Sequence, residues 1–190
     1  MSDALLKEDR HFTYADYKAW ELDEGERYEL IDGVAYAMSA PNDRHQALLL
    51  ALLLKIGNFL EGKSCKVRPA PYDVRLFYAE DESDDTVVQP DISVICDGSK
   101  LGDEGCRGAP DLVVEIVSPS NTVYEMARKL DLYRRADVRE YWVVYPDNKS
   151  LHVHRFQGGQ IVSRIYGEKD VVSTEVLPGL EIALGPVFAG

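Results

Sequence analysis

Two acidic residues interrupt runs of β-branched apolar residues, and this pattern limits how the chain can fold. Asp91 lies in the run 87–95, and Glu115 lies in the run 112–117. Such runs predict strands that are largely covered by protein. An ionised carboxylate inside a covered strand is costly unless a cation or a metal ion pairs with it. Lys129 follows on the next segment, so the sequence predicts two acids and a lysine close together.

The length and composition are those of an ordinary globular protein. The chain has 190 residues, of which 45% are hydrophobic and 28% charged, and this is long enough for one domain spanning residues 1–190. The apolar stretch 47–54 is much shorter than the roughly 20 residues that a membrane-spanning helix needs. The N-terminus lacks the apolar region of a signal peptide. We therefore expect a cytoplasmic protein that does not enter a membrane.

The cysteines and the net charge bear on the class of protein. Cys65, Cys96 and Cys106 are odd in number and show no CxxC spacing, which argues against a disulfide framework and against a zinc ribbon. The formal net charge is −12, whereas proteins that bind nucleic acids usually carry a basic surface. Part of the negative charge lies in the loop 80–85, which we expect to be solvated and distant from any site.

Helix caps and hydrophobic spacing predict a mixed order of helices and strands. Thr13 is expected to cap a short helix that ends near Leu22, and Asp32-Gly33 is expected to form the turn of a hairpin. Further helices are expected from Pro41 to about Gly62 and from the turn at 118–121 to about Ala136. Strands are expected near 66–68, 72–77, 87–95, 112–117, 141–145, 151–156 and 161–166, with a last strand pair around 178–179. Tyr133 and Trp142 are expected in the core. The order predicts an α/β fold with a central mixed β-sheet flanked by α-helices.

The acids and the lysine allow two interpretations. Asp91 and Glu115 offer hard oxygen ligands, which favour Mg²⁺ or Mn²⁺ over zinc. A metal ion held there could activate water and neutralise charge on a scissile phosphate, while Lys129 could orient or deprotonate the water or stabilise the developing charge. The residues equally allow two structural acids that pair with Arg75, with Lys129 or with backbone amides. If the acids cluster, at least one of them should have a raised pKa.

Several segments together resemble a known family. They are Tyr28-Glu29-Leu30-Ile31-Asp32-Gly33, His45-Gln46, Val88-Gln89-Pro90-Asp91-Ile92, Val114-Glu115-Ile116-Val117-Ser118-Pro119-Ser120, Lys129-Leu130-Asp131-Leu132-Tyr133 and Val138-Arg139-Glu140-Tyr141-Trp142-Val143-Val144. The set resembles the PD-(D/E)XK nuclease superfamily, and more closely its Uma-type family of proposed endonucleases, long classed as a domain of unknown function. The resemblance covers nearly the whole chain and implies a restriction-endonuclease-like core.

The chain departs from the superfamily pattern at a few positions. The superfamily has its lysine two residues after the second acid, where this chain has Val117. In Uma-type proteins the lysine has moved to the following helix, and Lys129 matches that position. The family's aspartate one helical turn earlier is Glu125 here, which would be an i,i+4 partner for Lys129. Asp137 stands where a glycine is common in the family.

Other polar residues have both a functional and a structural interpretation. The resemblance places Glu29 near the metal as the superfamily's N-terminal acid, although a surface glutamate would fit the local pattern. His45 stands at a helix start, whose dipole favours anions, and could contact a phosphate, the attacking water or a turn carbonyl. Gln89 could bond the site or lie exposed. His152 and His154 lack a third metal ligand, so we expect them at the surface.

The sequence and the resemblance together predict a Mg²⁺- or Mn²⁺-dependent endonuclease, a hydrolase of phosphodiester bonds in DNA. Asp91 and Glu115 are expected to bind the metal, Lys129 to assist the water, and Glu29 and His45 to support the site. A homodimer is expected, because nucleases that cut both strands often act as two-fold dimers. The alternative is a non-catalytic protein that uses the nuclease fold for binding or assembly, which the net charge and the displaced lysine would favour.

Overall fold

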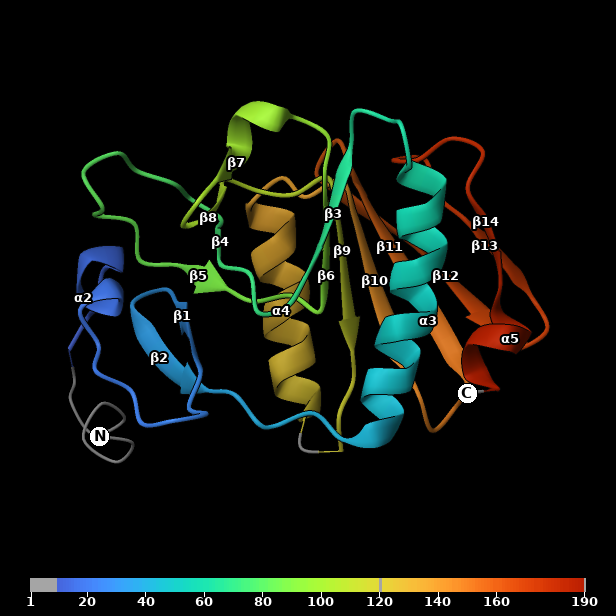
Figure 1. Cartoon of the computed structure of the whole chain (residues 1–190), viewed down its shortest axis with the longest axis horizontal. Helices are drawn as coiled ribbons and strands as arrows, with labels where there is room; N and C mark the ends of the chain where they lie inside the picture. The colour runs from blue at the N-terminus through green and yellow to red at the C-terminus, as the bar shows by residue number, and fades with distance from the viewer. Residues whose placement is uncertain (1–9, 120, 190) are drawn as a thin grey trace.

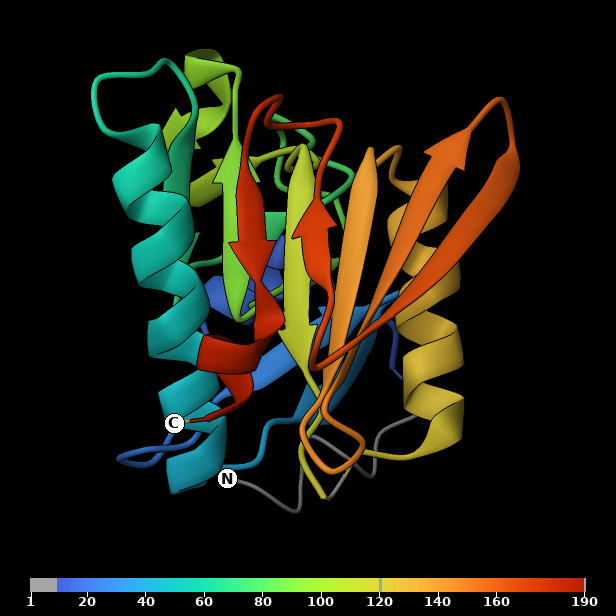
Figure 2. The same cartoon turned by 90° about the vertical axis from the view of Figure 1, so that its right-hand side faces the viewer.

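A mixed six-stranded sheet, called here the main sheet, forms the centre of the fold. The computed structural model describes residues 10–119 and 121–189. In spatial order the main sheet contains β12 (Gln160–Gly167), β11 (Ser150–Gln157), β10 (Glu140–Tyr145), β9 (Leu112–Ile116), β6 (Ile92–Ile95) and β3 (Lys66–Pro69). Strands β9 and β10 are parallel, and the other neighbouring pairs are antiparallel. The hairpin β11–β12 extends along one edge of this sheet (Figure 2).

A second six-stranded sheet lies beside the main sheet (Figure 1). Its spatial order is β2 (Val34–Ala37), β1 (Tyr28–Ile31), β5 (Val87–Val88), β4 (Val74–Arg75), β8 (Gly105–Arg107) and β7 (Leu101–Gly102). The predicted hairpin is confirmed, because β1 and β2 join through Asp32 at φ 48° and Gly33 at φ 75°. Both residues have the left-handed conformation that a two-residue hairpin turn needs. We predicted one central sheet and did not foresee the second.

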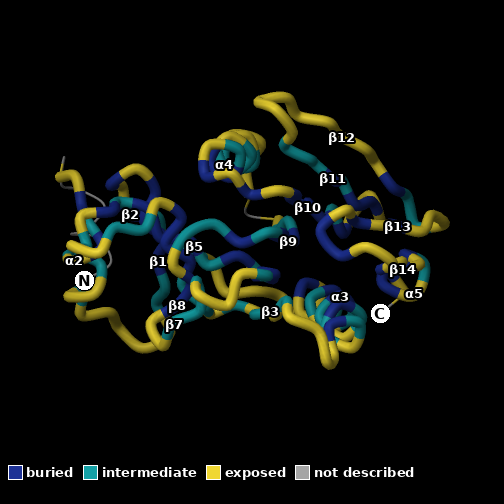
Figure 3. Tube along the Cα trace, turned by 90° about the horizontal axis from the view of Figure 1, so that it is seen from above, coloured by how far each residue is buried: buried dark blue, intermediate teal, exposed yellow. Residues whose placement is uncertain are grey.

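Helices cover both faces of the main sheet. These helices are α3 (Asp43–Leu60), α4 (Val123–Arg135) and α5 (Leu184–Phe188). The helix α2 (Tyr14–Lys18) packs against the second sheet instead. The fold also contains one 3₁₀ turn, η1 (Gly98–Lys100), and a two-stranded sheet of β13 (Val171–Ser173) and β14 (Glu181–Ala183). Figure 3 shows α4 on one face of the main sheet, and α3 and α5 on the other. The predicted α/β fold with a mixed sheet flanked by helices is therefore confirmed. In the described ranges no helix combines the length and apolarity that a bilayer crossing requires.

Strand β9 is buried on both faces, and its alternation decides where its acid points. Leu112, Val114 and Ile116 belong to the hydrophobic cluster that includes the buried face of α3. Val113 belongs to a second cluster, together with residues of α4. Since successive side chains of a strand point to opposite faces, Glu115 lies on the face that α4 covers. The second cluster also takes in residues of the second sheet, so the two sheets share a hydrophobic core.

The run 87–95 does not form the single strand that its sequence predicts. Val87–Val88 belongs to the second sheet as β5, and Ile92–Ile95 belongs to the main sheet as β6. The chain crosses between the sheets at Gln89, Pro90 and Asp91. Proline has no N–H to continue a strand ladder, which accounts for the break. Asp91 therefore precedes a strand instead of interrupting one.

Three local predictions were wrong. The first helix ends at Lys18 and not near Leu22. The loop 80–85 is not fully solvated, because the carboxylate of Asp84 is buried and pairs with Arg75. A disulfide joins Cys65 and Cys96, which directly precede β3 and follow β6 and so face each other across an antiparallel pair.

Candidate active site

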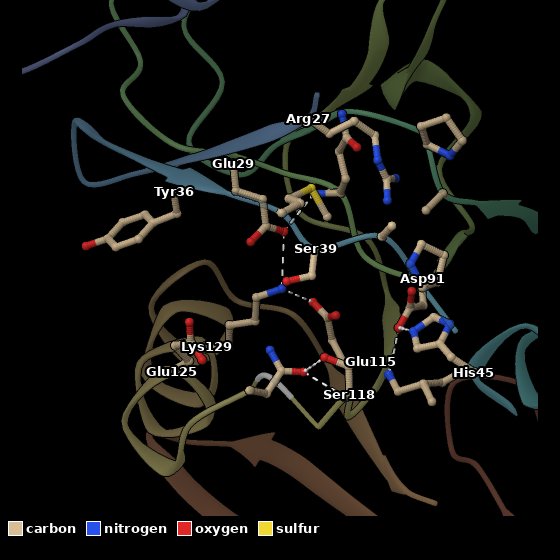
Figure 4. Close-up of a pocket in the computed structure, with 18 of the residues that line it drawn as sticks. Arg27, Glu29, Tyr36, Ser39, His45, Asp91, Glu115, Ser118, Glu125 and Lys129 are labelled. Carbon is tan, nitrogen blue, oxygen red and sulfur yellow. Dashed lines mark hydrogen bonds and ion pairs between the residues drawn. The ribbon is translucent and has the colours of Figure 1, made fainter. Parts of the chain in front are cut away.

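All five residues that the sequence singled out line one pocket, which has a volume of about 420 Å³ (Figure 4). They come from different parts of the fold. Glu29 lies on β1, His45 on α3, Asp91 at the crossing between the sheets, Glu115 on β9 and Lys129 on α4. The pocket therefore lies where the second sheet, the main sheet and two helices meet.

Lys129 joins two of the three acids. Its Nζ lies 2.7 Å from Oε1 of Glu115 and 3.1 Å from Oε1 of Glu29. The lysine side chain is only 14% exposed, so its ammonium points into the pocket and not into solvent. An ammonium between two carboxylates offsets part of the cost of burying their negative charge.

A capping box starts α4 and so fixes where Lys129 stands. Thr122 Oγ1 accepts a hydrogen bond from the backbone N–H of Glu125 at 3.2 Å, and the backbone N–H of Thr122 donates to Glu125 Oε2 at 2.6 Å. This reciprocal pair satisfies backbone donors at the helix start. The expectation that Glu125 pairs with Lys129 was wrong, because its carboxylate serves the cap.

Asp91 is held by the backbone of β9 and by His45. Its Oδ2 accepts hydrogen bonds from the N–H of Ile116 at 2.7 Å and from Nε2 of His45 at 3.1 Å. Asn42 caps α3 by accepting a bond from the N–H of His45 at 2.9 Å, which fixes the first turn. Nδ1 of His45 is buried and has no hydrogen-bond partner among the described residues. Nε2 of His45 therefore contacts Asp91, whereas its Nδ1 is not accessible to solvent.

Two further residues bond the acids of the site: Tyr133, which the sequence analysis missed in this role, and Gln89, for which it had allowed such a bond. Tyr133, expected and found in the core, also donates its hydroxyl to Oε1 of Glu115 at 2.7 Å. The spacing of Lys129 and Tyr133, four residues apart on a helix, was the signal that could have found it. Gln89 donates its backbone N–H to Oε1 of Glu29 at 3.0 Å, while its side-chain amide bonds Oδ1 of Asp73 at 2.8 Å.

Burial and the charges of neighbouring side chains shift the pKa values of Glu115, Lys129 and His45. Burial raises the pKa of Glu115 to about 7, and the charges of Asp91 and Glu29 add to this against the lowering effect of Lys129. Burial would lower the pKa of Lys129, but the charges of Glu115 and Glu29 outweigh it and the pKa is raised. The pKa of His45 is also raised, because its bond to Asp91 outweighs burial. The predicted raised pKa of one acid is thus found at Glu115.

Comparisons with known proteins show the family and the fold of the chain. A family model named Uma2 and described as "Putative restriction endonuclease" matches residues 14–185. The chain belongs to the Uma2 family. "Uncharacterized protein slr1290" of Synechocystis sp. is 25% identical over 177 residues, which cover 92% of this chain and 90% of that protein. A crystal structure titled as a putative nuclease belonging to DUF820, from Anabaena variabilis, superposes with a TM-score of 0.73 at 18% identity and covers 94% of this chain and 98% of its own.

In this Uma2 protein the position of the superfamily lysine is structural. Val117 is half-buried and packs against the cluster beneath α4, and its N–H donates to the carbonyl of Val144 at 2.9 Å. Lys129 reaches the second acid from α4 instead. The sequence resemblance had placed the moved lysine there, and the structure shows its ammonium beside Glu115.

The donor set suits a hard divalent cation with few protein ligands. Within the described residues, no group of three or more His, Cys, Asp or Glu side chains could hold a metal ion. Asp91 and Glu115 line the same pocket, and one oxygen of each, Oδ1 and Oε2, makes no hydrogen bond within the described part of the chain. Mg²⁺ is commonly bound by one or two carboxylates plus waters and substrate phosphates. Asp91 Oδ1 and Glu115 Oε2 would supply the two carboxylate ligands that this kind of Mg²⁺ coordination needs.

Three other candidates, Arg75, His152 and His154, do not line the pocket. Arg75 does not pair with the acids of the site, because its guanidinium binds Asp84 and covers the ring of Tyr14 at 3.7 Å. His152 and His154 are half-buried on β11. Neither histidine lines the pocket.

Proposed function

We propose that this Uma2 protein is a metal-dependent endonuclease that hydrolyses phosphodiester bonds in DNA. The observation that carries the proposal is the position of the Lys129 ammonium, 2.7 Å from Glu115 and in one pocket with Asp91. The family description, a restriction endonuclease, supports the reaction class. The fold shared with a protein titled as a putative nuclease is compatible with it.

Asp91 and Glu115 would hold Mg²⁺ or Mn²⁺ through the oxygens that lack hydrogen bonds. Such an ion, when bound, lowers the pKa of a coordinated water and neutralises charge on a phosphate. It would also favour the ionised form of Glu115, whose pKa is about 7 without a metal. Loading is therefore expected to improve as the pH rises through 7.

Lys129 acts in this proposal as a hydrogen-bond donor and a fixed positive charge. Its raised pKa keeps the ammonium protonated at neutral pH, which makes it a poor general base. From its place beside Glu115 it can orient a water or stabilise the charge that develops on the phosphate. His45 is a positioning residue, because its Nε2 is committed to Asp91 and its Nδ1 is buried. Glu29 holds the ammonium from the other side.

A nicking assay tests the proposal. Supercoiled plasmid is incubated with Mn²⁺ and with wild type, Glu115→Gln, Lys129→Ala or Lys100→Ala, and all four are first compared by thermal melting. Lys100 is a matched control, because its Nζ bonds the carbonyl of Ala109 at 2.8 Å and it does not line the pocket. We expect nicking by wild type and Lys100→Ala and at least a hundredfold loss in the other two. Equal nicking by wild type and Glu115→Gln would contradict the proposal.

A second candidate function is binding without cleavage. The observation that favours it is the lack, among the described residues, of a three-ligand metal group. Calorimetric titration with Mn²⁺ separates the two functions. Heat of binding that disappears in Asp91→Asn supports the endonuclease, whereas a folded wild type that binds DNA but neither binds Mn²⁺ nor nicks would support the second function.

We also propose that the protein acts as a homodimer if it cuts both strands, since one pocket serves one phosphodiester at a time. Sedimentation velocity with and without a DNA duplex tests this. A monomer in both conditions that still linearises plasmid in one step would contradict it.

A further inference from the structure

We propose that Arg27 and Arg128 form a binding site for nucleic-acid phosphates next to the reacting phosphodiester. This inference deepens the proposed function and rests on it for the identity of the ligand. The two arginines come from different elements, Arg27 from the segment before β1 and Arg128 from α4, and both line the pocket.

Arg128 is held in place without a carboxylate. Its guanidinium carbon lies 3.8 Å from the ring centroid of Tyr36, a residue of β2 that also lines the pocket. The Nε atom is buried and has no hydrogen-bond partner among the described residues. Stacking fixes the plane of a guanidinium and lowers the entropy cost of using its remaining nitrogens. A planar fork held in this way matches the two non-bridging oxygens of a phosphate.

Arg27 extends into the pocket from the side opposite Lys129 (Figure 4). Its charge acts on the site, since it lowers the proton affinity of His45. No ion pair joins Arg27 to an acidic side chain within the described residues, and the same holds for Arg128.

Most arginines of this acidic chain pair with carboxylates. The chain has 33 acidic residues against 21 lysines and arginines, and Arg75 and Arg155, for example, form ion pairs. The acids of the pocket are already engaged by Lys129, by His45 and by a helix cap. Two free guanidinium groups beside a polar cavity therefore point to an anionic ligand that spans the pocket. A polynucleotide backbone, with phosphates at regular spacing, has the required chemistry.

The test is the salt dependence of DNA binding, measured in EDTA so that no cleavage occurs. Anisotropy of a fluorescein-labelled duplex gives the affinity at several NaCl concentrations for wild type, Arg27→Gln, Arg128→Gln and Arg164→Gln. Arg164 is the matched control, because it lies 4.7 Å from the ring of Tyr166, has no carboxylate partner among the described residues and does not line the pocket. Melting curves first confirm that each variant is folded.

Each pocket variant should lower the slope of log affinity against log salt by about 0.9, the value for one lost phosphate contact on duplex DNA. Arg164→Gln should keep the wild-type slope, and Arg128→Lys should keep the slope while binding more weakly. Equal slopes for Arg128→Gln and Arg164→Gln, or no binding of wild type to DNA at low salt, would overturn the inference. Binding with arginine-dependent slopes but no nicking in Mn²⁺ would leave this inference standing and refute the endonuclease. Nicking by wild type together with slopes that do not depend on the arginines would refute this inference and leave the endonuclease proposal standing.

Discussion

Two neighbouring tyrosines have hydroxyls in opposite surroundings. The rings of Tyr133 and Tyr141 lie 4.7 Å apart, and both residues are fully buried. The hydroxyl of Tyr133 donates to Glu115, whereas the hydroxyl of Tyr141 is buried without a partner among the described residues. A buried polar group without a hydrogen bond destabilises the folded state, and a bond to a charged group stabilises it.

The two phenylalanine substitutions should therefore change stability in opposite directions. We expect Tyr133→Phe to lower the free energy of unfolding by about 1.5–3 kcal/mol, because Glu115 loses a donor. We expect Tyr141→Phe to raise it by about 1 kcal/mol or to leave it unchanged. Urea unfolding of both variants at pH 8 measures this. Equal destabilisation by the two changes would show that the hydroxyl bond to Glu115 contributes nothing.

Glu115 should make the metal-free protein less stable as the pH rises. Its pKa is about 7 in the folded protein against 4.5 ordinarily, so the folded state binds a proton more tightly than the unfolded state does. The resulting stabilisation is complete below 4.5 and is lost as the pH rises through 7. It amounts to about 3 kcal/mol.

The Glu115→Gln variant isolates this effect, because glutamine does not titrate while His45 and the other groups remain. The difference in unfolding free energy between variant and wild type should shift in favour of the variant by up to about 3 kcal/mol between pH 5 and pH 8 in EDTA. A difference that stays constant over this range would mean that Glu115 titrates as an ordinary glutamate.

At the residue scale, the sequence predicted which side chains meet but not how each is bonded. Asp91, Glu115 and Lys129 were found from their strand and helix context and from the family resemblance. Tyr133 was predicted only as a core residue, because a tyrosine on an apolar helix face does not show which group its hydroxyl will bond. The cap formed by Glu125 was missed because the i,i+4 pairing and the capping box use the same carboxylate.

Helix α4 carries Lys129 and Arg128, two of the three cations proposed to act in the site, and its two ends are fixed in different ways. The capping box holds the start. At the end, Asp137 has a φ of 60°, and the N–H of Val138 bonds the carbonyl of Tyr133 at 3.1 Å. This is the position where the family commonly has glycine, which adopts a positive φ without steric cost.

Asp137→Gly should therefore stabilise the protein. We expect a gain of about 0.5–1 kcal/mol, because the left-handed conformation costs an L-residue about 1–2 kcal/mol and the greater freedom of glycine in the unfolded chain cancels about half of that gain. The melting temperature compared with wild type measures it. A loss of stability would mean that Asp137 makes a favourable interaction in the folded state that outweighs its backbone strain.

Elements with local signals were predicted well, and elements decided by distant contacts were not. Asp32-Gly33 determines its hairpin within a few residues, and Thr13 caps its helix as expected. The run 87–95 has the composition of one strand, yet it serves two sheets, because its halves pair with β1 and β9, which are far away in sequence. Periodicity does not report which neighbour a strand will find.

For the molecule as a whole, the disulfide ties an edge strand to the main sheet. Cys65 and Cys96 are 31 positions apart, and β3, which Cys65 precedes, pairs only with β6 in that sheet as described. Closing a loop of this length restricts the unfolded chain by about 3–4 kcal/mol in the entropy model. The third cysteine, Cys106, is buried, and burial raises its pKa to about 11, so it is a poor nucleophile for exchange.

Reduction should therefore lower stability without removing the pocket, which lies elsewhere. We expect a reductant to lower the free energy of unfolding of wild type by about 3–4 kcal/mol, and to leave Cys65→Ser unchanged. Urea unfolding with and without the reductant gives both values. Equal stability of reduced and oxidised wild type would exclude a contribution of the disulfide.

The pocket draws on segments that are made at very different times. Glu29 and Lys129, which share a hydrogen bond, are 100 positions apart, and β10, the parallel neighbour of β9, follows later still. On the ribosome, a growing chain would expose Glu29 and Asp91 before Glu115 and Lys129 have been made. A chain interrupted near residue 95 would therefore lack two of the residues that line the pocket. If the proposed cleavage occurs, it would begin only once α4 and β10 have been made and packed together.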